Sequence, residues 1–329
     1  MAVQITILGL RRIGTSIGLA LASIKDQTIR VGNDREPMIA RQAEKLGAVD
    51  KTVINLPTAV RDADVVILAL PVDEIRETLE VIAQDLKPGS VLIDTSPVKN
   101  AVAQWAKELL PAEDRYFVGL TPSLNPAYLM ETGDNPETAH ADLFKNGPML
   151  INSLPGIDES AISLTTNLTR ILGATPLFAD AVEADGLTAY SHLLPRLVSA
   201  ALVNATIDQP GWREARKIAG QAYAQATEPV LYPEESKVLG QAALLNRDNT
   251  VRMLDQVLIE LRQMRNLIAE SEAAALQERL EHAQIGREQW WADRLKADYE
   301  VKPDNPAAVP TSGEMFGRLF GLRSRKDKK

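Results

Sequence analysis

The chain contains no cysteine, and only 3 of its 329 residues are histidine. Without cysteine it can form no disulfide bond, no thiolate metal site and no cysteine nucleophile. No run of apolar residues reaches the length of a membrane span. The chain enters a strand directly, without the charged and apolar regions of a signal peptide, so we expect a cytoplasmic protein with no metal site.

Positive charge is also scarce, because 44 acidic residues outnumber 36 basic ones and give a net charge of −8. No basic stripe with interleaved aromatic residues occurs in the body of the chain, so we expect no nucleic-acid partner. The remaining composition, with 45% hydrophobic and 24% charged residues, is typical of a soluble globular protein. A chain of this length is large enough for two domains and a sizeable core.

The start of the chain, residues 3–22, predicts a buried strand, a glycine turn and a helix. Apolar residues alternate up to Leu8, and others recur at helical spacing behind Gly14. This order forms the first half of a dinucleotide-binding unit, whose helix N-terminus offers backbone N–H groups to a pyrophosphate. The residues expected to bind the cofactor here are Gly9, Leu10, Arg11, Arg12, Ile13 and Gly14.

Arg11 stands where the usual Gly-x-Gly-x-x-Gly pattern has its middle glycine. That glycine normally lets the backbone approach the phosphates closely, and a side chain there should crowd them. Two interpretations remain open. Either the Arg11 guanidinium pairs with a phosphate oxygen, or the nucleotide site has decayed.

Asp34 follows the second predicted strand, residues 28–32, and lies about 20 residues past Gly14. An acidic side chain at this place can accept hydrogen bonds from both ribose hydroxyls of NAD. The alternative role for Asp34 is to cap the following helix. The spacing favours the cofactor role and NAD, while Arg35 beside it leaves NADP open.

Strands and helices alternate along residues 1–179, which predicts an α/β fold with a Rossmann-type doubly wound parallel sheet. The later strands are expected at 63–70, 90–94, 116–120, 148–151 and 175–178. Ligands of such sheets lie at the carboxyl ends of the strands. The candidate residues at those ends are Leu70 and Pro71 for the cofactor, Ser96 and Thr121 for catalysis, and Asn125 for the substrate.

The chain changes character after residue 180, where no strand pattern survives. Helices are predicted over about 182–208, 211–227, 234–245 and 249–283, and the first is apolar almost all round, so we expect it to be buried on all sides. Residues 180–286 are therefore expected to form an all-α domain for dimerisation and substrate binding. Residues 287–329 are expected to be a flexible linker and a basic tail, which either lies free or docks a partner.

Several segments in order over residues 3–270 resemble the prephenate/arogenate dehydrogenases of tyrosine biosynthesis. Besides Asp34, they are ITILGLRRIGTSIGLAL, VVILALPVD, LIDTSPVK, YFVGLTPSLNP, ADLFKNGPMLI and AYSHLLPRLVSAALVN. The resemblance implies a Rossmann domain, a helical dimerisation domain, a homodimer and a nicotinamide cofactor. It also implies oxidation of the ring alcohol of a prephenate-like carboxylate by hydride transfer to NAD(P), with loss of CO₂.

Three positions depart from the family's pattern at its reacting centre. Thr121 stands where the family has a histidine that hydrogen-bonds the oxidised hydroxyl, and a threonine does not act as a general base near neutral pH. Pro97 occupies the register of a family serine, with Ser96 one residue early. Glu228 replaces an arginine that binds a substrate carboxylate, and this reverses the charge.

His192 is the family histidine that survives, within a Ser-His-Leu segment that matches the family. The resemblance implies that it faces the substrate cleft, and we expect a catalytic role. The alternative is a buried histidine on an apolar helix. Arg196 is the nearby candidate to bind a substrate carboxylate in place of the lost arginine.

Three functions remain open. The first is an NAD(P)-dependent oxidoreductase of the prephenate dehydrogenase type, with weak or absent activity on prephenate. The second is a catalytically degenerate dimeric paralogue that acts as a nucleotide-binding sensor or scaffold. The third is a β-hydroxy-acid dehydrogenase. Such enzymes typically have a lysine beside an asparagine, and here Asn204 is present but the lysine is not, which disfavours this function. The resemblance favours the first.

Overall fold

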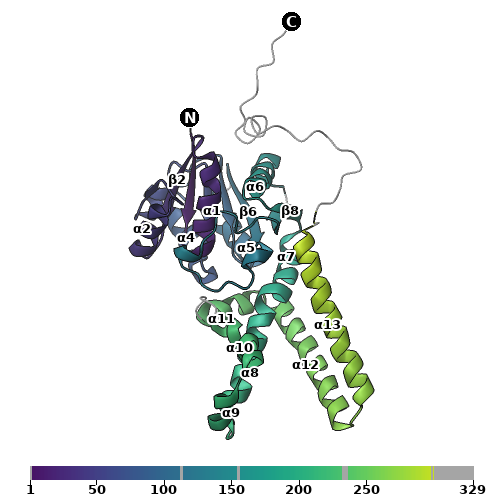
Figure 1. Ribbon diagram of the computed structural model, residues 1–329. Helices are drawn as coiled ribbons and strands as arrows, with labels where there is room; N and C mark the ends of the chain where they lie inside the picture. The colour runs from purple at the N-terminus through teal and green to yellow at the C-terminus, as the bar shows by residue number, and fades with distance from the viewer. Residues whose placement is uncertain (1, 112–113, 154–155, 232–235, 298, 300–329) are drawn as a thin grey trace.

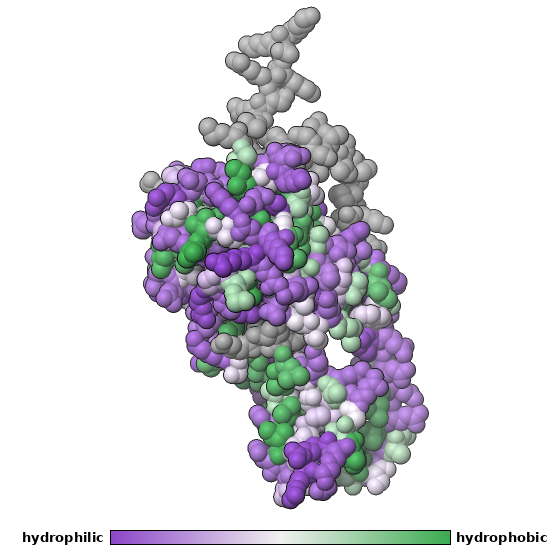
Figure 2. Space-filling view, turned by 60° about the vertical axis from the view of Figure 1, so that its left-hand side comes forward, coloured by the Kyte–Doolittle hydropathy of each residue, from purple (hydrophilic) through white to green (hydrophobic). Residues whose placement is uncertain are grey.

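The computed structural model describes residues 2–111, 114–153, 156–231, 236–297 and 299. An eight-stranded sheet with helices on both faces lies above a group of helices in the view of Figure 1. This is the expected Rossmann-type α/β fold followed by an all-α region. In the space-filling view, hydrophobic side chains gather on the surface of the lower, helical part (Figure 2).

The sheet contains strands in the order β3-β2-β1-β4-β5-β6-β7-β8. Their bounds are β1 (Val3–Leu8), β2 (Thr28–Asn33), β3 (Lys51–Thr52), β4 (Val65–Leu68), β5 (Ser90–Asp94), β6 (Arg115–Pro122), β7 (Pro148–Ser153) and β8 (Thr175–Phe178). The helices among them are α1 (Arg12–Leu21), α2 (Pro37–Lys45), α3 (Leu56–Val60), α4 (Val72–Ile82), α5 (Asn100–Leu109) and α6 (Glu159–Ile171). Short 3₁₀ turns are η1 (Ala22–Ile24), η2 (Pro126–Tyr128) and η3 (Pro136–Thr138).

The sheet departs from the predicted parallel arrangement at one pair of strands. Strands β6 and β7 run antiparallel, with Thr121 opposite Leu150, while every other neighbouring pair is parallel. A parallel connection has to carry the chain back to the opposite edge of the sheet, usually through a helix. The connection from β6 to β7 contains only η2 and η3, so β7 starts at the edge where β6 ends.

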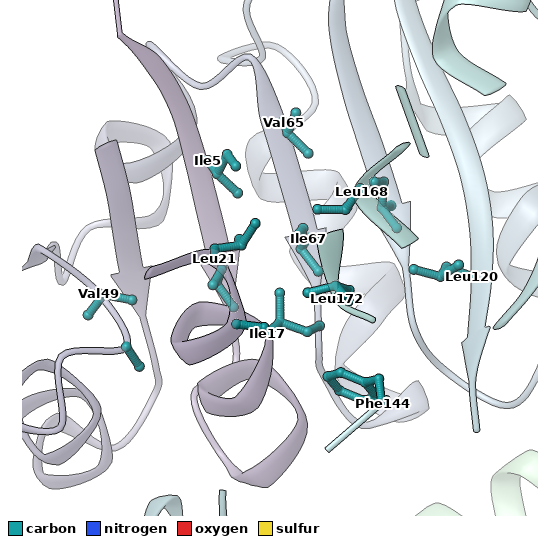
Figure 3. Packing of buried hydrophobic residues seen from close by; sticks show 14 of the residues in the cluster. Ile5, Ile17, Leu21, Val49, Val65, Ile67, Leu120, Phe144, Leu168 and Leu172 are labelled. Atoms are coloured by element: carbon teal, nitrogen blue, oxygen red, sulfur yellow. The ribbon is translucent and has the colours of Figure 1, made fainter. Parts of the chain in front are cut away.

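Alternate residues of each strand face opposite sides of the sheet, and each side has its own hydrophobic core. On one side, Ile5 and Ile67 pack with residues of α1 and α6, among them Ile17 and Leu168 (Figure 3). On the other side, Leu8, Val66, Leu68 and Leu92 pack with residues of α4 and α5, including Ile75, Leu79 and Val102. The near-continuous apolar run in β4 therefore serves both cores.

The helical region begins directly after β8. Its elements are α7 (Ala181–Thr188), the π-helical turn η4 (Ala189–Leu193), α8 (Leu194–Ile207), α9 (Trp212–Ile218), α10 (Gln221–Thr227), the 3₁₀ turn η5 (Glu228–Leu231), α11 (Ser236–Leu245), α12 (Arg247–Ala269) and α13 (Ala273–Lys296). No helix in the described ranges is both long enough and apolar enough to cross a bilayer.

The helix expected to be buried on all sides is only partly buried within the single chain. It is divided among α7, η4 and α8, and Ser199 is the only residue of α8 that is buried. Leu202 and Ile207 lie on its exposed surface. The expectation was wrong because the single chain folds its other helices against only part of α8.

The predicted helix over 249–283 is two antiparallel helices, and the second extends past the expected domain end at residue 286. Ser271 adopts a left-handed backbone conformation with φ 56°, and the chain reverses there between α12 and α13. Helix α13 continues to Lys296, so the first residues of the expected flexible tail are helical. Stacking of the Arg287 guanidinium on Trp290 and Trp291, 4.7 and 5.1 Å from the ring centroids, supports this extension. The rest of the basic tail lies outside the described residues.

The helical region is joined to the sheet at the carboxyl end of β5. The Asp185 carboxylate of α7 accepts hydrogen bonds from the backbone N–H groups of Lys99 and Asn100 at 2.6 and 3.1 Å, at the start of α5. The Asn246 side chain in turn donates to the Asp185 carbonyl at 2.7 Å. Leu193 packs into the core beneath α4 and α5. These contacts hold η4 and α8 beside the edge of the sheet where ligands bind.

Candidate active site

The glycine turn lies at the crevice between β1 and β4, where the strand order reverses. A Cβ on Gly9, which has φ +88°, would lie 2.3 Å from the Ala69 carbonyl oxygen. A Cβ on Gly14 would lie 1.8 Å from the Gly9 carbonyl oxygen. Both glycines are therefore required to bring the N-terminus of α1 this close to the strands. Ligands of open α/β sheets bind at this kind of crevice.

Asp34 lies beside this turn, at the carboxyl end of β2. One carboxylate oxygen accepts the Leu10 N–H at 2.7 Å, and the other accepts the Glu36 N–H at 2.8 Å. The Leu10 side chain is fully buried, and its backbone N–H and carbonyl are bonded to Asp34 and to the Thr15 hydroxyl, so Leu10 shapes the turn and does not contact a ligand in this conformation. Asp34 is half-buried, and each of its oxygens keeps a second lone pair for a hydroxyl donor.

The two arginines of the turn are held by other parts of the chain. The Arg11 guanidinium pairs with Glu36 at 2.6 Å and lies 3.6 Å from the Asp134 carboxylate. Arg12 is only 4% exposed, and its guanidinium binds the carboxylate and the carbonyl oxygen of Glu131, each at 3.0 Å. The backbone N–H of Arg12 donates to the Asp134 carbonyl at 2.7 Å. Ile13, next along, is half-buried.

Leu70 and Pro71 form the wall opposite the turn, after β4. The Leu70 side chain lies 3.1 Å from the place of a Cβ on Gly9. Pro71 is the N-cap residue of α4 and directly precedes the first helical residue, Val72. The two residues therefore border the crevice from the β4 side.

Ser96 belongs to a buried polar cluster at the end of β5. Its hydroxyl donates to the Asp94 carboxylate at 2.9 Å. Lys99 is fully buried, and its ammonium group lies 2.8 Å from the same carboxylate and donates to the Leu120 carbonyl at 3.2 Å. Burial lowers the pKa of Lys99, whereas the Asp94 charge raises it. The cluster ties the end of β5 to the end of β6, because Lys99 spans both strands.

Thr121 follows Leu120 on β6 and is 8% exposed. Its hydroxyl oxygen is buried and makes no hydrogen bond to any of the described residues. Leaving a buried hydroxyl without a partner costs about 1–3 kcal/mol. Thr121 is thus the candidate catalytic residue with an unused hydrogen-bonding group at this edge.

Both polar atoms of the Asn125 side-chain amide form hydrogen bonds within the chain. Its N–H donates to the Asp142 carbonyl at 3.1 Å, and its oxygen accepts the Ala127 N–H, also at 3.1 Å. These bonds hold the connection between β6 and β7. A substrate contact from Asn125, which stays a prediction, would require one of the bonds to be exchanged.

His192 lies in the π-helical turn η4. Its Nδ1 is 3.0 Å from the Ser191 hydroxyl. Removal from water, and then the positive charges of Arg196 and Lys99, lower the pKa of His192 to about 4. The imidazole is therefore neutral near pH 7, and it lies in a positive field that suits an anionic ligand.

Glu228 begins η5, which packs against α8. The Ser199 hydroxyl of α8 donates to the Ala226 carbonyl at 2.7 Å and fixes this segment two residues before Glu228. Arg196 lies one turn earlier on α8. The reversed charge at Glu228 is therefore close to the helix that carries the candidate substrate anchor.

A family model described as prephenate dehydrogenase, nucleotide-binding domain, matches residues 17–175. The cyclohexadienyl dehydrogenase of Zymomonas mobilis is 24% identical to this chain over 303 residues, which are 91% of this chain and 98% of that protein. These matches support membership of the prephenate dehydrogenase family, whose model covers just under half of this chain. The range matched by the family model begins after the glycine turn.

Two further dehydrogenases of this kind agree with the chain in fold or in part of the sequence. A crystal structure of the Aquifex aeolicus prephenate dehydrogenase, in complex with hydroxyphenyl propionate and NAD⁺, superposes with a TM-score of 0.76 at 19% identity, over 88% of this chain and 98% of that one. A 4-amino-4-deoxyprephenate dehydrogenase of Streptomyces pristinaespiralis is 41% identical over 69 residues, 21% of this chain and 23% of that protein. The structural likeness shows the shared fold.

Four residues that organise this candidate site were absent from the residues predicted from the sequence. Lys99 and Asp185 join the sheet to the helices, while Glu131 and His140 lie over α1 and are 2.8 Å apart. The pairing of Lys99 could have been predicted from the sequence, because a lysine just after a buried strand needs an acidic partner. No sequence pattern pointed to Glu131 and His140, since they lie in a polar connection without hydrophobic periodicity.

Proposed function

We propose that this chain is an NAD-dependent dehydrogenase that acts on a prephenate-like carboxylate and releases CO₂. The observation that carries the proposal is Asp34, hydrogen-bonded to the backbone of the glycine turn at the reversal of strand order. Membership of a dehydrogenase family supports it. The closely approaching backbone at Gly9 and Gly14 and the position of Asp34 fit the diphosphate and ribose of a dinucleotide.

The charges around Asp34 favour NAD over NADP. Arg35 could bind a 2′-phosphate, but its guanidinium pairs with Glu74 at 2.9 Å, as Arg11 pairs with Glu36. Burial raises the pKa of Glu74, and the nearby Asp73 and Asp34 charges add to that rise against the opposing effect of Arg35. The four carboxyl groups of Asp34, Glu36, Asp73 and Glu74 thus lie near only two guanidinium groups, and a further phosphate would be repelled.

The proposed substrate site lies between the ends of β5 and β6 and the start of α8. Arg196 and the buried Lys99 supply the positive field for a carboxylate, and neutral His192 supplies a hydrogen bond. Thr121 offers its unpartnered hydroxyl to the ring substituent at the oxidised carbon. Bound NAD⁺ supplies the hydride acceptor. The chain's own contribution is to orient the ring and to hold the carboxylate that leaves as CO₂.

Oxidation of a ring alcohol is expected to be slow at this site. The hydroxyl proton has to leave as the hydride leaves, which calls for a general base with a pKa near the working pH. Thr121 cannot hold that proton, and His192 with a pKa of about 4 is a weak base. Glu228 adds repulsion toward a dianionic substrate. Activity on prephenate is therefore proposed to be weak.

A ring amine is a second candidate for the substrate group, and Thr121 is the observation that favours it. When a hydride leaves the carbon that bears a neutral amine, the nitrogen lone pair forms an iminium ion, so no proton has to be removed in that step. Loss of the ring carboxylate as CO₂ then returns its electron pair to the ring, which becomes aromatic. The local similarity to a 4-amino-4-deoxyprephenate dehydrogenase supports this alternative.

The test is calorimetric titration with NAD⁺ and NADP⁺, followed by nicotinamide absorbance with prephenate, arogenate and 4-amino-4-deoxyprephenate. We expect NAD⁺ to bind more tightly than NADP⁺, and the amine to be oxidised faster than the alcohols. Turnover of prephenate at an ordinary rate of about 1–10³ s⁻¹ would contradict the assignment of the site. Binding without turnover of any substrate would favour the degenerate sensor or scaffold.

We also propose that the helical region forms a homodimer. Large apolar side chains are exposed on its helices, and they include Ile218 at 85%, Leu231 at 81%, Leu244 at 74%, Ile268 at 63% and Ile285 at 65% exposure. Figure 2 shows hydrophobic side chains on the surface of the lower part of the molecule. Apolar surface of this extent is typical of protein interfaces.

A further inference from the structure

Residues 131–140, here called the strap, lie across the N-terminus of α1. The strap's Asp134 carbonyl accepts the Arg12 N–H at 2.7 Å, at the first residue of the helix. The backbone N–H groups at this end of a helix are the donors that hold the diphosphate of a dinucleotide. In this structure the strap already uses one of them.

The strap also provides negative charge to the turn. The Glu131 carboxylate lies 3.0 Å from the Arg12 guanidinium, and the Asp134 carboxylate lies 3.6 Å from that of Arg11. The Nε of Arg12 is buried and has no partner among the described residues. Two carboxylates and two carbonyl oxygens, those of Glu131 and Asp134, thus meet the same cationic turn that the oxygens of a diphosphate would meet.

The far end of the strap is anchored separately. His140 donates its backbone N–H to the Ser16 hydroxyl of α1 at 3.1 Å, and its ring lies 2.8 Å from the Glu131 carboxylate. Tyr128 stacks on the His140 ring with centroids 4.0 Å apart. These contacts hold the strap against the helix on both sides of η3.

We infer that residues 131–134 occupy the diphosphate position of the cofactor site, and that a dinucleotide binds only when the strap opens. The inference rests on the dinucleotide site proposed above. An N–H that points at the Asp134 carbonyl cannot also donate a full hydrogen bond to a phosphate. A diphosphate placed there would also lie beside the Glu131 and Asp134 carboxylates and repel them.

If the strap is closed in most molecules, the apparent dissociation constant for the dinucleotide equals that of the open site divided by the fraction of molecules that are open. If about one molecule in ten is open, the apparent dissociation constant is about tenfold higher than that of the open site. A change that weakens the strap alone therefore tightens dinucleotide binding. If the strap merely supported the site, the same change would weaken binding.

Two variants weaken the closed strap by different means. Glu131→Gln removes the charge that holds Arg12. Gly133→Ala places a side chain where φ is +115° and where a Cβ would lie 2.8 Å from the Thr138 side chain, so it strains the closed turn. Glu108→Gln is the control, because it breaks a carboxylate–arginine pair with Arg76 on the far helices α4 and α5.

Calorimetry with NAD⁺ should give about five- to tenfold tighter binding for Glu131→Gln and Gly133→Ala than for the wild type, and no change for Glu108→Gln. Hydrogen exchange of the wild type should show faster exchange in residues 131–140 on adding NAD⁺, together with protection of residues 10–15. An ordinary ligand-supporting loop would become protected instead.

The outcomes separate this inference from the proposed function. If both strap variants bind NAD⁺ as tightly as the wild type or more weakly, and residues 131–140 become protected, closure of the strap is contradicted while the cofactor assignment stands. Absence of binding in the wild type but binding in the variants would support closure. Absence of NAD⁺ binding in every form would overturn both the strap and the cofactor assignment.

Discussion

Two buried polar side chains at the carboxyl edge of the sheet differ in how their polar atoms are satisfied. The Lys99 ammonium group donates to the Asp94 carboxylate and to two carbonyl oxygens, so each of its three N–H donors has an acceptor. The Thr121 hydroxyl on the neighbouring strand meets none of the described residues. A buried group without a partner is costly to maintain, so Thr121 is where a ligand has most to gain at this edge.

Replacing Thr121 with histidine should increase the rate of prephenate oxidation. A positioned acid/base group contributes about 10²–10⁴-fold. We expect kcat to rise within that range in Thr121→His combined with Glu228→Arg, measured by nicotinamide absorbance. Thr121→Gln, also combined with Glu228→Arg, is the matched control. The glutamine side chain is polar and similar in length to histidine, but it does not exchange a proton with the substrate near neutral pH. An equal gain in the control, or none in the histidine variant, would argue against the assigned position.

His192 should make the fold less stable in acid. Its native pKa of about 4 lies below the ordinary value of about 6.5, so the unfolded state takes up the proton first as pH falls. The stabilisation is complete above pH ~6.5 and is lost between about 6.5 and 4. Because the ring is half-buried, we expect a loss of about 1–3 kcal/mol.

The measurement is urea unfolding at several pH values in that range. The wild type should lose more stability on acidification than His192→Gln, by the amount given above. His282→Gln, at an exposed position on α13, should behave like the wild type. Identical pH profiles for the wild type and His192→Gln would mean that the imidazole is accessible to protons in the native state.

At the scale of the element, the strand–turn–helix unit of β1 and α1 depends on contact between backbone atoms. Gly14→Ala puts a methyl group 1.8 Å from the Gly9 carbonyl oxygen, so α1 has to move away from β1. We expect a loss of about 3 kcal/mol or more in urea unfolding, with loss of NAD⁺ binding. Gly240→Ala on α11 meets open space and should be neutral or stabilising by about 0.5–1 kcal/mol. Similar stabilities for the two variants would contradict this packing.

At the scale of the whole molecule, the helical region extends away from the sheet as two diverging arms, α8–α10 and α12–α13 (Figure 1). The α12–α13 arm is held together by polar contacts such as that between Arg279 and Glu260, at 2.6 Å. Its Leu258 and Leu261 are each 56% exposed. Arms of this kind bury little apolar surface within one chain, which is the reason to expect a partner copy.

Charged substitutions on the arms should dissociate the dimer. Sedimentation equilibrium of the wild type should give twice the chain mass, and Ile218→Asp together with Leu258→Glu should shift it to one chain mass. Met38→Glu, an 81% exposed position on α2, should leave the dimer intact. A wild-type mass of one chain at every concentration would contradict the homodimer proposal.

Local patterns along the chain were sufficient to predict much of the first domain. Alternating and continuous apolar residues predicted β1, β4 and β5, and the strand at Thr175–Phe178 was predicted with its observed bounds. Gly9, Gly14 and Asp34 were predicted to lie at one end of the sheet because their spacing is set by the geometry of one strand–turn–helix unit. The sequence could determine these features because each depends on neighbours along the chain.

Only the tertiary structure decided the features that join distant segments. The antiparallel β7, the burial of Lys99 between β5 and β6, and the strap over Arg12 each depend on contacts between residues far apart in the sequence. The exposure of α8 depends likewise on how the later helices are placed. No periodicity encodes such contacts, because they arise from the packing of whole elements and from the pairing of charges that burial would otherwise penalise.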